Sequence, residues 1–261
     1  MVKGIEQFKK FFEGYENNYI IIGGTACEYY EETYDLTPRA TKDIDIILLV
    51  EALSHEFVKR FWEFVTVADY TQNNIGTTGG GKGRHEYYRF RKPQAASADY
   101  PYQIELFSRS IGLLNIPEDA HITPIPTDED LSSLSAILMD DDYYNFTVEH
   151  SVVVDGIHLA KVECLLCLKA KAFVEMKTRR LLGEKIDNRD IEKHKKDVFR
   201  LAAMLAPADR FELPQTIKEH MGDFCRMVVD ELPNNDFLKA AGIRNVPTEE
   251  LFKRMKETFS L

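Results

Sequence analysis

The chain has 261 residues, a formal net charge of −10 and an apolar share of 44%. This length suits one large domain or two modest ones, and the apolar share is enough to fill a substantial core. An acidic chain is poorly suited to coating long stretches of nucleic acid, because neutralising phosphates requires Lys and Arg. No segment approaches the roughly 20 apolar residues that span a bilayer, and the first residues lack a signal-peptide pattern. A cytoplasmic protein without a membrane partner is expected.

The predicted elements alternate between helix and strand up to about residue 160. Periodicity and apolar runs predict helices at 5–15, 25–32 and 53–65, and strands at 19–22, 44–50, 85–91, 102–107, 151–154 and 157–159. Asp155-Gly156 between the last two strands is typical of a tight hairpin. Beyond residue 161, helices are predicted at 162–182, 188–205, 214–231 and 248–258, with prolines in the breaks. The pattern predicts an α+β protein, with a mixed sheet flanked by helices in residues 1–160 and a helical bundle in residues 161–261.

Two short motifs carry the candidate chemistry. Gly23 and Gly24 end the first buried strand, and Thr25 is expected to cap the helix that follows. Asp43 and Asp45 open the second buried strand, where residues two apart point to the same face. Two carboxylates so close are costly without a cation between them, and Mg²⁺ is typically held by one or two carboxylates plus substrate phosphates. Mn²⁺ is the alternative metal.

Taken alone, each motif is better explained structurally, Gly23-Gly24 as an ordinary turn and Asp43 as the cap of a strand. Their order along the chain is more informative: strand, Gly-Gly, helix, loop, Asp-x-Asp, strand. Glycine lets backbone N–H groups approach a triphosphate, and the helix N-terminus favours an anion. A metal between the carboxylates would serve phosphoryl or nucleotidyl transfer.

This order resembles the nucleotidyltransferase (DNA polymerase β-like) superfamily. A narrower similarity, to the AbiEii/AbiGii-type toxin branch, rests on Gly23-Gly24-Thr25-Ala26 and on Arg39-x-Thr41-x-Asp43-Ile44-Asp45. The resemblance implies a nucleotidyltransferase-like fold and nucleotide contacts at Gly23, Gly24, Thr25, Arg39 and Thr41. It also implies an RNA acceptor, such as tRNA, and a partner antitoxin, which composition does not show.

The superfamily often adds a third carboxylate, and the toxin branch adds a helical lysine and a Lys-Asp pair. Glu105 lies in a predicted strand and is either the third metal ligand or a satisfied polar residue. Lys169 fits the helical lysine best, with Lys171 as a nucleotide-binding competitor on another face of that helix. In Lys195-Lys196-Asp197, the carboxylate of Asp197 could orient the lysine or accept a proton as a base. The alternative is that these charges form solvated helix surfaces.

Positive charge is concentrated in the same region. Residues 161–200 contain twelve Lys and Arg against seven Asp and Glu. A basic region on an acidic body suits an anionic ligand of limited size, although a solvated helix without a partner would have the same composition.

Three other patterns are weaker. Residues 76–83 approximate a phosphate-binding loop, but Gly83 follows Lys82 where Ser or Thr is required. Cys164 and Cys167 have Cys-x-x-Cys spacing without a second pair for zinc, so buried reduced thiols are expected. The acidic run at 140–142 is expected to be a solvated turn.

The predicted activity is therefore metal-dependent transfer of a nucleoside monophosphate from an NTP to an acceptor hydroxyl, in the toxin of a toxin–antitoxin-like pair. One alternative is a small-molecule nucleotidyltransferase of the aminoglycoside-modifying type. Another is a non-catalytic nucleotide-binding module that kept the fold.

Overall fold

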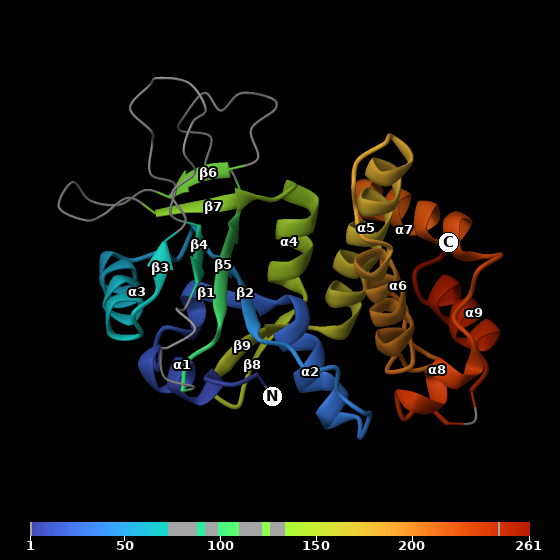
Figure 1. The fold of residues 1–261 in the computed structure, drawn as a ribbon, viewed down its shortest axis with the longest axis horizontal. Coiled ribbons are helices and arrows are strands. Elements are labelled where there is room, and N and C mark those ends of the chain that lie inside the picture. Colours follow the sequence, from blue (N-terminus) through green and yellow to red (C-terminus); the bar gives the residue numbers. More distant parts are fainter. Residues whose placement is uncertain (1, 73–87, 92–98, 110–121, 126–133, 245) are drawn as a thin grey trace. The chain divides into compact units, whose positions relative to one another are not determined.

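The computed structural model describes residues 2–72, 88–91, 99–109, 122–125, 134–244 and 246–261. Within them the chain forms two compact units (Figure 1). The first unit comprises Met1–Thr25, Ala40–Tyr144 and Ser151–Leu159, and the second comprises Ala26–Arg39, Asn145–His150 and Ala160–Leu261. The phosphate-loop-like segment at 76–83 lies outside the described residues.

A mixed sheet forms the framework of the first unit. Its strands in the described residues are β1 (Tyr19–Ile22), β2 (Asp43–Leu48), β3 (Thr71–Gln72), β4 (Arg89–Arg91), β5 (Gln103–Ser108), β6 (Ile122–Ile125), β7 (Leu134–Leu138), β8 (Ser151–Val154) and β9 (Ile157–Ala160). The main order is β3-β4-β5-β2-β1-β9-β8, and β7 pairs with both β5 and β6. Strand β2 runs antiparallel to β1 and parallel to β5. It therefore occupies the middle of the sheet, where its ends are held on both sides.

The helices of the first unit are α1 (Ile5–Phe11), η1 (Glu16–Asn18) and α3 (His55–Val67), with the start of α2 (Gly23–Thr33) and most of the first turn of α4 (Asp141–Glu149).

One face of the sheet is covered by aromatic side chains. Phe8 of α1 lies 5.3 Å from Tyr19 of β1, and Phe61 of α3 lies 5.3 Å from Phe90 of β4, between ring centroids. Helices α1 and α3 thus pack on the same face as Tyr19 and Phe90, which leaves the other face of β2 and β5 for polar residues.

The predicted hairpin is confirmed. Strands β8 and β9 are adjacent in the sheet, and Asp155 and Gly156 between them have φ of 50° and 73°. Positive φ at both central residues is the type I′ geometry that matches the twist of paired strands.

The acidic run at 140–142 was expected to be a solvated turn, but it is the start of α4. The Asp140 carboxylate accepts the N–H of Asp142 at 3.0 Å and of Tyr143 at 3.4 Å, which satisfies donors of the first helical turn.

Helices dominate the second unit. Beyond the segments of α2 and α4 it contains α5 (Val162–Leu181), α6 (Asn188–Ala202), α7 (Gln215–Val228), α8 (Asn235–Ala240) and α9 (Thr248–Thr258). Asp187 caps α6 by accepting the N–H of Arg189. Phe173 of α5 and Phe224 of α7 are fully buried with ring centroids 5.2 Å apart. The four longer helices agree with the predicted ones, whereas α8 was not predicted.

The predicted fold class is confirmed, since a mixed sheet flanked by helices is followed by a helical C-terminal part. The predicted division at residue 160 stays a prediction, and the second unit also includes residues 26–39 and 145–150. All four cysteines are buried and unbridged, as expected. In the described part of the chain, no helix has the length and apolarity to cross a bilayer.

Candidate functional site

The first cluster of candidate residues lies on the polar face of β2. Asp43 and Asp45 are half-buried, whereas Ile44 and Ile46 between and beyond them are at most 1% exposed. This alternation is the two-residue period of a strand with one face in the core. The expectation that the two carboxylates project from the same face is confirmed.

Gly23 lies directly beside Asp45. It has a φ of 68°, and a Cβ added there would lie 1.9 Å from Oδ2 of Asp45. Only glycine fits, because any side chain would displace this carboxylate and strain the backbone. The predicted proximity of the glycine bend and the carboxylate pair is therefore confirmed.

Thr25 does not cap a helix, so that expectation is wrong. Helix α2 begins at Gly23, two residues earlier, and Thr25 is inside its first turn. The Thr25 side chain is fully buried, and its hydroxyl donates a hydrogen bond of 2.7 Å to the carbonyl oxygen of Asp43. The hydroxyl thus joins the start of α2 to the start of β2. Contact with a phosphate would fall to the backbone N–H groups of Gly23, Gly24 and Thr25, which lack partners within the helix.

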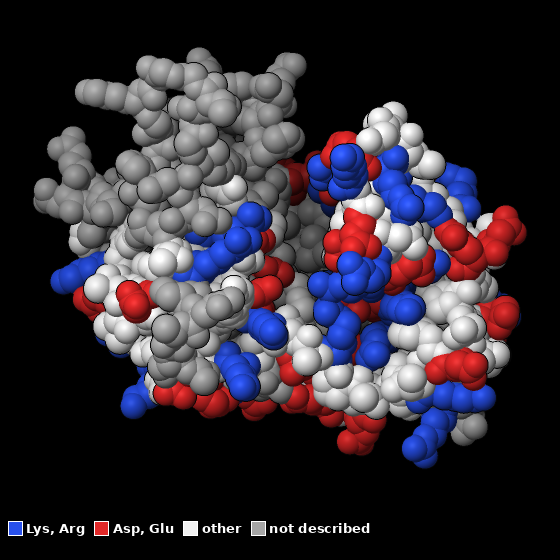
Figure 2. Space-filling view, in the orientation of Figure 1, with Lys and Arg blue, Asp and Glu red and all other residues white. Residues whose placement is uncertain are grey.

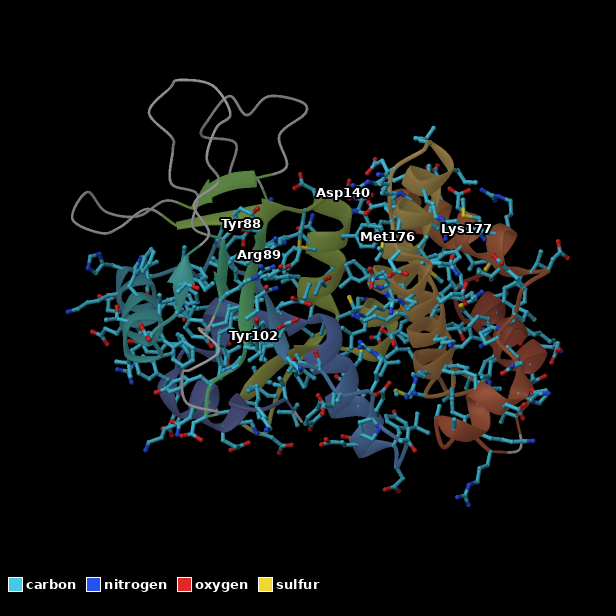
Figure 3. The ribbon with its side chains drawn as sticks, in the orientation of Figure 1. Tyr88, Arg89, Tyr102, Asp140, Met176 and Lys177 are labelled. Carbon is cyan, nitrogen blue, oxygen red and sulfur yellow. The ribbon has the colours of Figure 1, made fainter. Side chains whose placement is uncertain are left out.

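Glu105 stands next to Asp45 in the parallel pairing of β2 and β5, so both side chains lie on the same face. Its carboxylate is held by Arg89 of β4 and by the amide of Gln103, which donates at 2.8 Å. Figure 3 shows Arg89 on the strand beside β5. Among the described residues there is no group of three or more His, Cys, Asp and Glu positioned to hold a metal. The role of Glu105 as a third ligand stays a prediction.

The carboxylate oxygens beside Gly23 are ligands that suit a divalent metal of the Mg²⁺ type. Two carboxylates on one strand face supply hard oxygen ligands, and the absence of a side chain at Gly23 lets the Asp45 carboxylate lie directly against the start of α2. Mg²⁺ usually completes its octahedral shell with waters and substrate phosphates. The chemistry of the pair therefore matches a metal that is shared with a phosphate-bearing substrate.

The second cluster lies within the second unit, around Asp197 of α6. Asp197 is 2% exposed, and its two carboxylate oxygens accept from Nε of Arg39 at 3.2 Å and from its terminal nitrogen at 3.3 Å. Nζ of Lys169, on α5, lies 3.6 Å from the same carboxylate. Lys171 is instead 3.7 Å from Glu175, one turn along α5. The structure therefore brings Lys169, and not Lys171, together with Asp197.

Arg39 is held in place from its backbone as well. Its backbone N–H donates a hydrogen bond of 2.8 Å to the carboxylate of Glu31 in α2. The same carboxylate forms an ion pair of 3.3 Å with Arg200 of α6. Thr41, the other residue of the Arg-x-Thr motif, is half-buried in the segment that leads into β2.

Two further residues belong to this cluster and were not predicted. Lys193 precedes Asp197 by one helical turn and is exposed, and partial desolvation together with the charges of Arg39 and Lys169 lowers its pKa. His194 has a buried Nδ1 without a hydrogen-bond partner among the described residues. Burial and the charge of Lys169 lower the pKa of His194 to about 4. The sequence could have indicated Lys193, because it precedes Asp197 by four residues and residues four apart share a helix face.

The pKa of His194 predicts a pH-dependent stability. The unfolded chain takes up this proton near pH 6.5 and the folded chain near pH 4, so stability should fall as the pH drops through that window. Between pH 7.5 and pH 4.5 the wild type should lose about 2 kcal/mol more unfolding free energy than His194→Gln. Urea unfolding at both pH values measures the difference. Identical losses in the two proteins would contradict the assignment.

Both cysteines of the Cys-x-x-Cys motif are core residues of α5. Cys164 and Cys167 are at most 1% exposed, and burial raises the pKa of both thiols. Neutral thiols in the core are unsuited to binding metal or to redox exchange. The expected structural role is confirmed.

Comparison with known proteins leaves the family open. No family model matches the chain, and no curated protein shows significant similarity to it. Among solved structures it is similar to JHP933 from Helicobacter pylori, with a TM-score of 0.37 and 14% identity over 98% of this chain and 87% of that one. It is also similar to an H. pylori protein provisionally described as a nucleotidyltransferase, with a TM-score of 0.37 and 12% identity over 98% and 89% of the two chains. These similarities are too weak to assign a family or a function.

Proposed function

We propose that this chain is a metal-dependent nucleotidyltransferase that moves a nucleoside monophosphate from an NTP to an acceptor hydroxyl. The observation that carries the proposal is the first cluster: Asp43 and Asp45 share one strand face, and Gly23 is kept side-chain-free directly beside Asp45. A carboxylate pair next to a glycine at a helix N-terminus provides a metal ligand set and a phosphate cradle together.

Asp43 and Asp45 would hold Mg²⁺ or Mn²⁺, with Glu105 as a candidate third ligand. When bound, the metal would neutralise charge on the phosphates of the substrate. The N–H groups at the start of α2 would bind phosphate oxygens, which places Gly23, Gly24 and Thr25 in backbone rather than side-chain contact with the nucleotide.

Lys169 would contribute a compact positive charge for the triphosphate. Asp197 is engaged by both Arg39 and Lys169, which favours a role in orienting these cations over a role as a base. In the reaction, the acceptor oxygen bonds to the α-phosphorus and the bond from that phosphorus to the bridging oxygen of the β-phosphate breaks. Pyrophosphate leaves, and the hydroxyl proton passes to solvent or to a nearby base.

The resemblance to the AbiEii/AbiGii-type toxin branch suggests RNA, such as tRNA, as the acceptor and an antitoxin as a partner. A small-molecule acceptor of the aminoglycoside type is the alternative. A nucleotide-binding module without turnover is the second alternative, and the retention of both Asp43 and Asp45 speaks against it.

A transfer assay tests the proposal. The full chain is incubated with each labelled NTP and Mg²⁺ or Mn²⁺, first with total RNA and then with candidate small hydroxyl compounds. Label that appears in an acceptor, together with pyrophosphate release, is the expected result. NTP binding without transfer under every condition would favour the non-catalytic module.

Gly23→Ala should damage the site without unfolding the protein. The new Cβ would force Asp45 to rotate away, and a misplacement of about 1 Å commonly costs about 100-fold in rate. Gly14→Ala is the matched control, because Gly14 has a φ of +84° and nothing within 4 Å of an added Cβ. Both variants should carry a backbone strain of about 1–2 kcal/mol, because an alanine takes a positive φ in each. Urea unfolding measures this strain, so the two variants differ only in the clash with Asp45. Equal transfer rates in the two variants would show that the position of Asp45 does not matter.

A further inference from the structure

The second unit has an open pocket of about 500 Å³ whose lining is unlike the rest of this acidic chain. The lining comprises Arg39, Asn188, Arg189, Glu192, Lys193, Lys196, Asp197, Arg200 and Phe237. Five of these residues are basic and two are acidic, whereas the whole chain carries a net charge of −10. Figure 2 shows Lys and Arg side chains over α6, with Asp and Glu side chains among them.

Four of the basic residues form one row along α6. Arg189, Lys193, Lys196 and Arg200 follow each other at intervals of four, three and four, the spacing that keeps residues on a single helix face. With a rise of 1.5 Å per residue the row is about 16 Å long. A triphosphate is compact, because its three phosphates share bridging oxygens. In a duplex, each strand carries a charge about every 3.4 Å of axis, so a row of this length spans about five successive phosphates.

The acidic residues of the pocket are already neutralised. Asp197 is bound by Arg39 and Lys169, and Glu192 lies 2.9 Å from Nζ of Lys195. Within the row, Arg189 pairs with Asp187 at 2.6 Å and Arg200 pairs with Glu31 at 3.3 Å, whereas Lys193 and Lys196 have no acidic partner within ion-pair distance among the described residues. Their charges are therefore available to an external anion.

An aromatic ring borders the row. Phe237, at the pocket wall, is half-buried, with Nζ of Lys196 and Cζ of Arg200 each 5.5 Å from its ring centroid. Aromatic rings beside a basic groove are typical of single-strand binding, where bases stack on the ring and the groove follows the backbone.

We propose that this pocket binds the phosphate backbone of a single polynucleotide strand. The proposal rests on nucleotidyl transfer as the function, and it makes the acceptor a nucleic acid rather than a small molecule. The short row also explains how an acidic protein binds such a strand, since only a few phosphates need to be neutralised.

The test measures binding without catalysis. A fluorescein-labelled 12-nucleotide single-stranded RNA of mixed sequence, and DNA of the same sequence, are titrated with the full chain in EDTA and without NTP, at several salt concentrations. Fluorescence anisotropy gives the affinity and its salt dependence. Because no metal or NTP is present, the result is independent of whether the chain transfers nucleotides.

Arg189→Gln/Lys193→Gln should weaken binding about tenfold and reduce the slope of log affinity against log salt by about 1.4, since each phosphate contact contributes about 0.7 for single strands. Lys218→Gln/Lys253→Gln is the matched control, because it removes two exposed lysines from α7 and α9. It should change affinity less than twofold. Preference for RNA over DNA would identify a contact with the 2′-hydroxyl, and equal affinity would identify the backbone alone.

Two outcomes would overturn the proposal. One is an absence of binding to either strand at 50 mM salt, or equal weakening by both double variants. The other is that the Arg189/Lys193 variant loses affinity for a fluorescent ATP analogue while its affinity for the strands is unchanged. That outcome would assign the pocket to the triphosphate of the donor.

Discussion

Asp45→Asn should lower nucleotidyl transfer by at least about 1,000-fold, because losing one of two metal carboxylates removes several kcal/mol of transition-state stabilisation. Asparagine has nearly the same shape, so the strand and its neighbour Gly23 need not move. The measurement is labelled-NMP transfer to the acceptor identified with the wild type. Thermal unfolding with and without Mn²⁺ adds a readout that does not depend on turnover. The wild type should gain about 2–3 kcal/mol of stability at a metal concentration 100 times the dissociation constant, and the variant far less.

Asp69→Asn is the matched control for this experiment. Asp69 is exposed after the end of α3 and has a φ of 55°, a conformation that asparagine also adopts readily. The control should keep wild-type transfer and wild-type stabilisation by metal. If Asp45→Asn kept both as well, the carboxylate pair would not be a metal site and the proposed function would be wrong.

The sheet was predictable where a local pattern has only one physical solution. The apolar run of β1 follows from burial on both faces of the strand. The alternation at the start of β2 follows from burial on one face. Asp155-Gly156 specifies its own turn, because both residues must adopt positive φ. The same local reasoning placed Asp43 and Asp45 on one face, since a strand has a fixed period of two.

The rest depends on contacts between residues far apart in the chain. Thr25 is polar and well suited to a cap, but its hydroxyl bonds to the Asp43 carbonyl, 18 residues away. Glu105 was interpreted as either a third metal ligand or a satisfied polar residue, and periodicity could show neither its pairing with Asp45 nor its contact with Arg89. The choice between Lys169 and Lys171 likewise required knowing which face of α5 meets Asp197.

Asp197→Ala should cost about 3–5 kcal/mol of unfolding free energy. Asp197 and Lys169 have side chains only 2% and 9% exposed, so the substitution would remove a carboxylate that lies 3.6 Å from a buried ammonium group. Arg39, whose side chain is 31% exposed, can turn towards solvent and should contribute less. Urea unfolding of the full chain at pH 7.5 measures the loss.

Glu175→Ala is the matched control, because it removes the partner of Lys171 from the same helix α5, where the glutamate side chain is 54% exposed. An exposed pair of this kind contributes about 0–0.5 kcal/mol, so the two losses should differ by several kcal/mol. Lys169→Met/Asp197→Ala provides the second comparison. Removing both charges should recover part of the stability, since the cost arises from burying the Lys169 cation without this carboxylate rather than from the lost ion pair itself. If the double variant were less stable than Asp197→Ala, packing around Asp197, and not charge pairing, would determine the stability of this cluster.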